Sequence, residues 1–198
     1  MKRKVLLVEP NYKNKYPPMG LMKIATYYRQ IGDNVRFFKG DLKDLVADLI
    51  IEELLEKLYV LNSEIKWRKY KLILIEYIRK SKTAKLDECS VFCENTEAYQ
   101  LAKEARLSYK RKDYFKNPPF DKVVVTTLFT FYWDITIDTI NFVKQLCKDQ
   151  KDVMIGGIMS TLLPKEVYEA TGIKPFIGLL NHPCLLYTSD AADERPRV

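Results

Sequence analysis

The sequence has few residues that bind metals or form disulfide bonds, and it has no long hydrophobic run. Histidine occurs once in 198 residues, as His182, and cysteine occurs four times. Apolar stretches stay far below the length of a bilayer-crossing helix, since Leu72-Ile73-Leu74-Ile75 ends at Glu76. The basic start of the chain is followed by Val5–Val8, which is too short for the core of a signal peptide. We therefore expect a cytoplasmic protein without a membrane segment.

The cysteines do not form a complete metal motif. Cys89 and Cys93 have the C-x-x-x-C spacing, but the third cysteine of a C-x-x-x-C-x-x-C iron–sulfur motif would fall at Thr96. Because iron–sulfur clusters need three or four thiolates, we interpret Cys89 and Cys93 as free thiols in a polar loop. Disulfide bonds are not expected in a cytosolic protein.

Catalytic and nucleotide-binding motifs are also missing. No Ser/His/Asp, Cys/His or paired-carboxylate pattern is visible, so we do not expect this chain by itself to turn over a substrate. Pro10–Gly20 contains one glycine and therefore lacks the G-x-G-x-x-G of a dinucleotide-binding domain. A phospho-receiver domain needs an aspartate at the end of its third strand, where this chain has Val125-Thr126-Thr127.

What the sequence does contain is an alternation of short apolar runs and amphipathic helices. Lys4–Glu9 and Asn34–Phe38 predict two strands. Between them, after Gly20 and before Gly32, apolar residues recur at helical spacing: Leu21, Ile24, Ala25, Tyr28 and Ile31. A strand, a helix and a strand in so short a segment form a βαβ unit, whose strands are parallel and whose crossover is right-handed.

The same alternation returns in the second half of the chain. Strands are predicted near 122–127, 152–156 and 174–177, and Pro164–Ala170 is predicted to be helical. A further helix is predicted to begin with Asp134 as its cap and to place four apolar residues on one face: Ile140, Val143, Leu146 and Cys147. Short strands alternating with helices predict an α/β fold with a doubly wound, flavodoxin-like or Rossmann-like parallel sheet.

Residues 42–118 break this alternation. Leu42–Leu61, Ile65–Lys80 and Thr96–Lys110 carry helical patterns, and Pro118-Pro119 precedes the return to strand. We therefore predict one domain, residues 1–183, with a helical insertion at about 42–118 between its second and third strands.

Two groups of motifs resemble a known family. Tyr16–Ala25 contains the pattern P-P-x-G-L-x-x-x-A and is followed by Gly32-Asp33-Asn34-Val35. Later, Val153–Ile158 contains a double glycine, and Leu163–Glu166 reads L-P-K-E. In their order and spacing, these segments, which span about half of the chain, resemble the amino-terminal cobalamin-binding domain of radical SAM proteins.

The resemblance implies a cofactor site in the loops that follow the first, third and fourth strands. Its residues would be Pro18, Gly20, Leu21, Thr126, Thr127, Leu128, Gly156 and Gly157. Gly156 and Gly157 lack β-carbons, so their backbone could approach a bulky ligand, and Gly20 would leave N–H groups free at a helix start. The alternative is that the glycines merely form strand-to-helix turns. S-adenosylmethionine and a [4Fe–4S] cluster would bind in a radical SAM barrel domain that this chain lacks, and that barrel would be its partner.

The histidine that ligates cobalt in part of this family has no counterpart here. If Gly20 is the final glycine of the pattern D-x-H-x-x-G, Lys15 and Pro17 occupy the aspartate and histidine positions. Neither side chain ligates cobalt, so any cobalamin bound here would lack a protein histidine ligand. A degenerate scaffold or interaction domain that has lost cobalamin is the alternative.

The chain is basic, with a formal net charge of +7. One run interleaves Trp67, Tyr70 and Tyr77 with cations: Lys66, Arg68, Lys69, Lys71, Arg79, Lys80 and Lys82. Such a run could bind RNA or DNA. More often it is the solvated face of a helix, so a nucleic-acid partner is not expected.

The last residues match a foreign sequence. Eleven consecutive residues, Cys184–Glu194, match one reading frame of a transposase sequencing adaptor. We therefore interpret residues 184–198 as a non-native tail, and we expect the native part of this fragment to end near Pro183.

Overall fold

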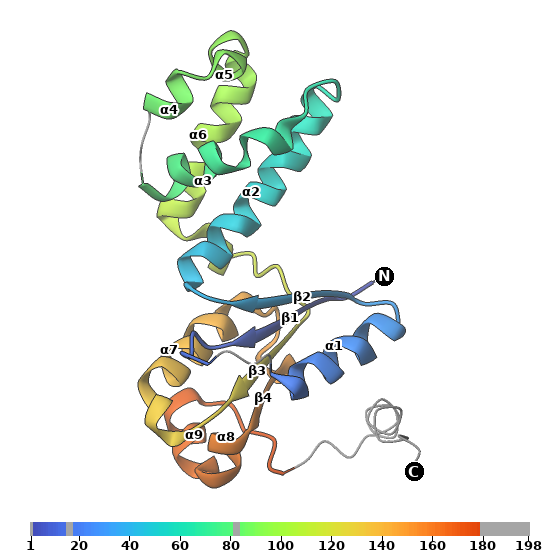
Figure 1. Ribbon diagram of the computed structural model, residues 1–198, viewed down its shortest axis with the longest axis vertical. Helices are drawn as coiled ribbons and strands as arrows, with labels where there is room; N and C mark the ends of the chain where they lie inside the picture. Colours follow the sequence, from blue (N-terminus) through green and yellow to red (C-terminus); the bar gives the residue numbers. More distant parts are fainter. Residues whose placement is uncertain (1, 15–17, 81–83, 179–198) are drawn as a thin grey trace, which may run out of the picture. The chain divides into compact units, whose positions relative to one another are not determined.

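The computed structural model describes residues 2–14, 18–80 and 84–178. The chain divides into two compact units, one made of the sequence up to Gly40 and from Pro118 onward, the other of Asp41–Asn117. We call them the sheet unit and the helical unit (Figure 1). The helical unit covers nearly the same residues as the insertion predicted at about 42–118. The predicted tail, and the positions Lys15, Pro17 and His182, lie outside the described residues.

The sheet unit is built on one parallel sheet. Its strands are β1 (Lys4–Glu9), β2 (Asn34–Lys39), β3 (Lys122–Thr127) and β4 (Val153–Gly157). Their order is β2-β1-β3-β4, and every neighbouring pair is parallel. The predicted doubly wound α/β fold is therefore confirmed, because the sheet grows outward in both directions from the central β1–β3 pair.

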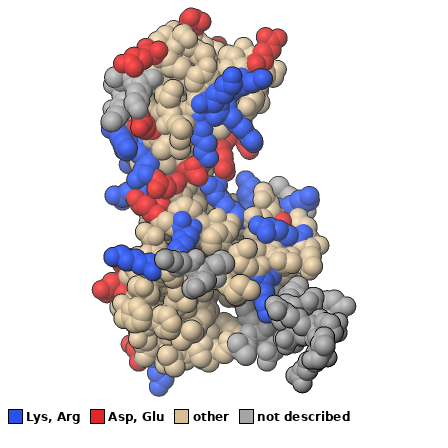
Figure 2. All heavy atoms as spheres, in the orientation of Figure 1, with Lys and Arg blue, Asp and Glu red and all other residues tan. Residues whose placement is uncertain are grey.

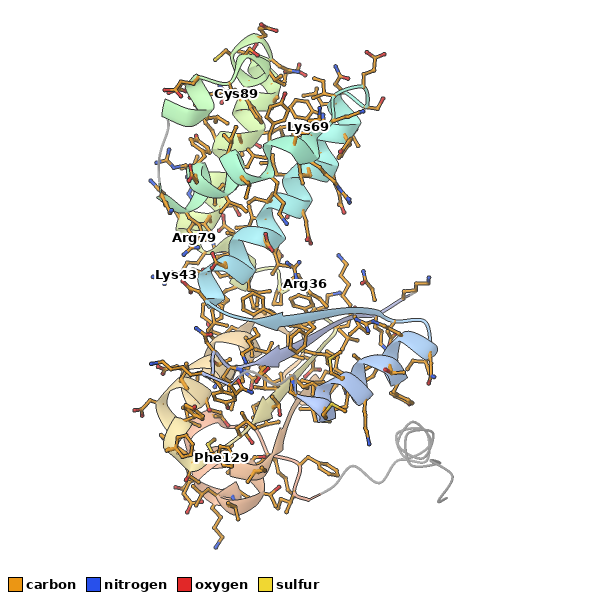
Figure 3. All side chains as sticks on the ribbon, in the orientation of Figure 1. Arg36, Lys43, Lys69, Arg79, Cys89 and Phe129 are labelled. Carbon is orange, nitrogen blue, oxygen red and sulfur yellow. The ribbon has the colours of Figure 1, made fainter. Side chains whose placement is uncertain are left out.

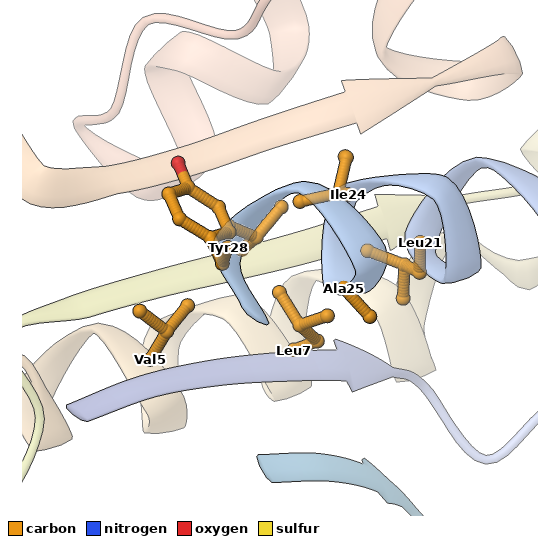
Figure 4. Close-up of a cluster of buried hydrophobic side chains, with 7 residues drawn as sticks. Val5, Leu7, Leu21, Ile24, Ala25 and Tyr28 are labelled. Atoms are coloured by element: carbon orange, nitrogen blue, oxygen red, sulfur yellow. The ribbon is translucent and has the colours of Figure 1, made fainter. Parts of the chain in front are cut away.

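The central strands are buried because helices cover both faces of the sheet. On one face, Val5, Leu7 and Val124 pack against α1 (Met19–Gln30). That helix buries four of the five residues that its sequence spacing predicted, which Figure 4 shows against β1: Leu21, Ile24, Ala25 and Tyr28. The prediction is wrong for the fifth, Ile31, which lies after the last residue of α1 and is 50% exposed. An apolar residue every three or four positions therefore decides which face of α1 is buried.

The helices α7 (Trp133–Val143), α8 (Ile158–Leu162) and α9 (Pro164–Thr171) belong to the second half of the sheet unit. A right-handed crossover places α7 on the face opposite to α1, as Figure 1 shows. Two details of its prediction are wrong. α7 begins one residue before Asp134, without a side-chain cap, and Leu146 and Cys147 lie beyond its end, although both are buried.

The prediction of a fifth strand at 174–177 is wrong. This segment runs beside β4, where the amide of Phe176 donates to the carbonyl of Ile155 over 2.7 Å. Pro175 has no N–H group, so it cannot extend a hydrogen-bonded ladder. Gly178 then turns the chain away with a φ of +83°. The segment therefore lies along the edge of β4 without becoming a strand of the sheet.

The helical unit contains α2 (Leu42–Leu61), α3 (Lys71–Lys80), α4 (Ala84–Asp87), α5 (Ser90–Glu94) and α6 (Thr96–Arg111). Short 3₁₀ helices accompany both units: Trp67–Tyr70, Asp113–Phe115, Thr130–Tyr132, Lys144–Leu146 and Gln150–Asp152. α2 begins where Asp41 accepts a hydrogen bond from the amide of Lys43, and α6 begins where Asn95 caps the amide of Ala98. None of the helices that the structure describes combines the length and apolar character needed to span a membrane.

Two of the three aromatic residues of the basic run, Trp67 and Tyr77, belong to the core of the helical unit, and Tyr70 is half-buried. Trp67 is fully buried and Tyr77 is 2% exposed. The indole N–H of Trp67 donates to the carbonyl of Asn62 over 2.7 Å, and its ring lies 5.7 Å from that of Phe92. Buried rings cannot stack on nucleic-acid bases. This arrangement favours the interpretation of the run as a solvated helix face.

The cations of the same run are interspersed with carboxylates. Arg79 pairs with Asp41 and Asp44, and Lys71 pairs with Asp48. Figure 2 shows side chains of both signs on the face of the helical unit that it displays. Mixed charge of this kind is typical of a solvated protein surface.

Two aspartates hold the amino-terminal end of β1. Asp33 accepts hydrogen bonds from the guanidinium of Arg3, and the shortest of them is 2.6 Å. Asp121 accepts from the side chain of Lys148 and from the amide of Lys4, both over 2.7 Å. The hydrogen bond from Arg3 lowers the pKa of Asp33, and the hydrogen bond from Lys148 lowers the pKa of Asp121.

We expect these two carboxylates to make the fold sensitive to acid. A carboxyl group whose pKa is lower in the folded chain stabilises the fold at pH values above its unfolded pKa of about 4. This stabilisation is lost as the pH falls through the pKa of the folded chain. Replacing both residues by asparagine should cost less than about 1 kcal/mol for each pair at neutral pH, because the cationic partners are exposed. The variant should also lose less stability on acidification. Urea unfolding at pH 7 and pH 3 tests this expectation, and an acid response equal to that of the parent would contradict it.

Candidate functional site

The carboxyl ends of all four strands lie at one edge of the sheet, because the strands are parallel. From β1 the chain continues to α1 and β2, whereas from β3 it continues to α7 and β4 on the other side. In open α/β sheets, ligands bind at such a reversal of strand order. The loops predicted as the site follow β1, β3 and β4 and so belong to this edge. We call it the switch edge.

Gly156 and Gly157 end β4, and they differ in what surrounds them. A β-carbon built on Gly156 meets nothing within 4 Å. At Gly157, where φ is +126°, a β-carbon would collide with the backbone of Thr127, 2.9 Å from its amide nitrogen and 3.0 Å from its carbonyl carbon. The strand-to-helix turn therefore requires glycine at position 157. The turn does not require it at position 156, where the space beside the backbone is open.

The two predicted threonines serve different faces of the sheet. Thr127 is buried, and its hydroxyl lies 3.2 Å from the carbonyl oxygen of Gly156 and 3.1 Å from the hydroxyl of Ser160. It also accepts a hydrogen bond from the amide of Ser160, so it holds α8 to β3. Thr126 points to the opposite face, because side chains alternate along a strand. It pairs with Gly156 in the strand register and is half-buried.

Leu128 ties β3 to its neighbours through its backbone. Its carbonyl accepts from the amide of Met159 over 2.8 Å, and its amide donates to the hydroxyl of Tyr12 over 3.4 Å. The Tyr12 hydroxyl also lies 2.7 Å from that of Thr136, and its ring stacks on Tyr132 at 4.7 Å. Burial raises the pKa of Tyr12. The sequence analysis missed Tyr12, because nothing distinguishes it within a polar loop.

An ion pair between a buried glutamate and a half-buried lysine joins the ends of β1 and β2. Glu9 is 1% exposed, and its Oε1 accepts from the side chains of Asn14, over 2.8 Å, and Lys39, over 3.2 Å. Lys39 lies directly across from Glu9 in the parallel register. The second carboxylate oxygen is buried and has no hydrogen-bond partner among the described residues. The sequence analysis missed this pair, although a glutamate that closes an apolar strand was a visible signal.

The start of α1 brings Pro18, Gly20 and Leu21 to the switch edge in different roles. The carbonyl of Pro18 accepts from the amide of Met22 over 3.1 Å and begins the helix. Leu21 is 2% exposed and packs in the core below α1, so its side chain stabilises the fold. Gly20 is exposed, and a β-carbon there would meet nothing within 4 Å. Local packing therefore does not account for glycine at this position.

Large apolar side chains are exposed on the segments that follow the strands at this edge. They come from the start of α1, the loop after β3 and α8, and we call them the apolar rim: Met19, Met22, Phe129, Phe131, Ile158 and Leu162. The rings of Phe129 and Phe131 stack with centroids 5.3 Å apart and planes 12° apart. Figure 3 labels Phe129 among these side chains. Exposed apolar side chains that lie against one another, as these two rings do, are typical of a binding surface.

The part of the chain that the structure describes contains no group of three or more His, Cys, Asp or Glu residues that could hold a metal ion. Cys89, Cys93 and Cys147 are free thiols. The prediction that Cys89 and Cys93 lie in a polar loop is wrong for Cys93, which belongs to α5. Its thiol donates to the carbonyl of Asp87 over 2.8 Å.

Comparison with protein-family models, with curated proteins and with solved structures gives no match to this chain.

Proposed function

We propose that the sheet unit is a cobalamin-binding-type domain of a radical SAM protein, and that its switch edge binds cobalamin without a histidine ligand. The observation that carries the proposal is the open backbone at Gly156. This residue ends β4, one strand away from the reversal of strand order between β1 and β3. It lies beside the half-buried Thr126 in the register, at the edge where the apolar rim is exposed.

The chemistry of these residues fits a bulky ligand with apolar faces and amide side arms. Gly156 and Gly20 let such a ligand approach the backbone, since neither carries a side chain and neither faces a neighbouring atom within 4 Å of a β-carbon. The Thr126 hydroxyl and the first amides of α1 can donate hydrogen bonds to its side arms. Phe129 and Phe131 would keep water from its faces. When bound, cobalamin would supply cobalt-centred alkyl-transfer chemistry.

The same residues support a partner for this domain. Exposing six large apolar side chains to water is unfavourable in free energy, and burying them against another protein surface would be favourable. In the full-length parent, the radical SAM barrel would hold S-adenosylmethionine and the [4Fe–4S] cluster, and we propose that it covers the apolar rim. The substrate would then lie between the barrel and the cofactor.

A degenerate scaffold domain is the second candidate, and a specific observation favours it. Leu21, Thr127 and Gly157 have roles in packing or turn geometry that need no ligand. In this case the apolar rim would serve the partner domain alone, and the switch edge would bind no cofactor.

Titration with hydroxocobalamin separates the two candidates. We expect weak binding to this chain alone, because much of the corrin would remain in water without the proposed partner domain. Gly156→Leu should weaken binding at least about tenfold, since a leucine side chain would occupy the space at the backbone. Glu169→Leu, which introduces the same side chain at an exposed position of α9, is the control and should leave binding unchanged.

Two results would count against the cobalamin proposal. Binding whose visible spectrum shows imidazole coordination would contradict the histidine-free site. If the chain without substitutions does not bind cobalamin, and if Gly156→Leu does not change its stability, the scaffold domain is the better explanation.

A further inference from the structure

The helical unit carries a groove between α2 and α6. Its central part has a volume of about 660 Å³ and is lined by Val60, Leu61, Leu101 and polar neighbours. A second hollow shares Lys57, Leu101 and Glu104 with it and continues toward Ile50. A third shares Thr96 and Glu97 and continues toward Ile65 and Val91. The three hollows therefore form one elongated groove.

The central hollow of this groove has an apolar floor and is open to solvent, whereas the two flanking hollows are more polar. α3 packs against both α2 and α6 and closes one side of that helix pair, but none of its residues lines the groove. Val60 is 89% exposed, although it lies at the carboxyl end of a helix rich in buried leucine. In a helical bundle, a further helix packs into the apolar channel between two neighbouring helices. α2 and α6 leave such a channel open.

The groove is acidic on a protein that is basic. Its lining includes one lysine and five glutamates: Glu53, Glu56, Glu94, Glu97 and Glu104. The lysine, Lys57, is already paired with Glu53 over 2.8 Å. The lining therefore has a formal charge of −4, whereas the whole chain has +7. A cationic occupant is selected by charge, and a nucleic acid is repelled.

We propose that this groove docks a basic amphipathic helix of a partner protein. Such a helix would place apolar residues at positions i, i+3 or i+4 and i+7 on the floor and would direct Lys or Arg toward the glutamates. The α2 segment from Ile50 to Leu61 spans about 17 Å at ~1.5 Å per residue, which matches about three turns of an occupant. The proposal is independent of the cobalamin site, which belongs to the sheet unit.

The test uses a fluorescein-labelled peptide of 16 residues, with leucine at positions 3, 6, 10 and 13 and lysine and alanine elsewhere. Fluorescence anisotropy with the whole chain should show saturable binding that weakens as salt increases. A peptide with glutamate in place of every lysine should not bind. The lysine peptide should also gain helicity in circular dichroism when the protein is added.

Val60→Asp is the decisive variant, because its two effects oppose each other. The added carboxylate strengthens purely electrostatic attraction to the peptide, whereas the lost apolar contact weakens docking on the floor. We expect affinity to fall about tenfold or more. Leu72→Asp is the matched control, because Leu72 is 76% exposed on α3 and does not line the groove. This control should bind as the parent does.

The double variant Glu97→Lys and Glu104→Lys should also weaken binding at least about tenfold, since both carboxylates line the central hollow. Affinity that is unchanged or higher in Val60→Asp would overturn the proposal, because attraction to surface charge would then explain the binding. Sedimentation that shows a dimer of the parent chain, lost in Val60→Asp, would also overturn it, because a second copy would be the occupant.

Discussion

Replacing Gly157 by alanine is expected to destabilise the sheet unit by about 3 kcal/mol or more. With φ at +126° and ψ at −170°, Gly157 occupies a backbone region that is nearly exclusive to glycine and costs another residue about 1–3 kcal/mol. The collision of the new β-carbon with the backbone of Thr127 adds to this cost, because the neighbouring strand β3 cannot move without breaking its ladder with β4.

Gly156→Ala provides the matched control for this experiment. The two glycines are adjacent in β4, but a β-carbon at Gly156 meets no atom within 4 Å and its φ is not positive. We expect this substitution to change the unfolding free energy by less than about 1 kcal/mol. Urea denaturation of both variants provides the measurement, and equal losses at the two positions would contradict the assignment of the turn to Gly157.

Replacing Trp67 by alanine should destabilise the helical unit by about 3–5 kcal/mol. The indole is fully buried, its N–H is bonded to the carbonyl of Asn62, and its ring lies against Phe92. Alanine would leave a cavity in the core of this unit and a backbone carbonyl without its partner. Hydrogen exchange of the amides of α2 and α6 would report the loss as weaker protection.

Leu72→Ala is the comparison for Trp67→Ala. Leu72 lies within the same basic run but is 76% exposed, so its truncation should change stability by less than about 0.5 kcal/mol. If the amides of α2 and α6 exchange as slowly in Trp67→Ala as in the unsubstituted chain, the ring does not stabilise the core. That result would favour the interpretation of the run as a nucleic-acid-binding surface.

The burial of Trp67 and Tyr77 bears on function as well as on stability. A basic run with interleaved aromatics has the composition of an RNA-binding surface, and sequence alone cannot decide whether its rings face solvent. Both rings point into the helical unit, and Lys71 and Arg79 pair with aspartates. The cations therefore remain as a solvated surface in which Trp67 and Tyr77 cannot serve as the stacking platforms that single-stranded nucleic acids use.

The sequence by itself determined the elements whose signals are local. The apolar run of β1, the three- and four-residue spacing in α1 and the helical patterns around α2 and α6 predicted the parallel α/β fold and its insertion. These elements are predictable because one buried face requires a regular spacing within a single segment. The polar cap at Asn95 follows the same local chemistry.

Only the tertiary structure decided the features that depend on residues distant in sequence. The parallel register sets Lys39 across from Glu9, and the proximity of β3 makes glycine necessary at position 157 but not at 156. The segment that contains Pro175 runs beside β4 but forms no strand. Pro175 has no N–H to continue the hydrogen-bonded ladder, and this lack has an effect only because the fold brings the segment next to β4. The acidic groove likewise exists only because α2 and α6 pack together. Which groups meet across such contacts depends on the three-dimensional path of the chain, and no spacing within one segment encodes it.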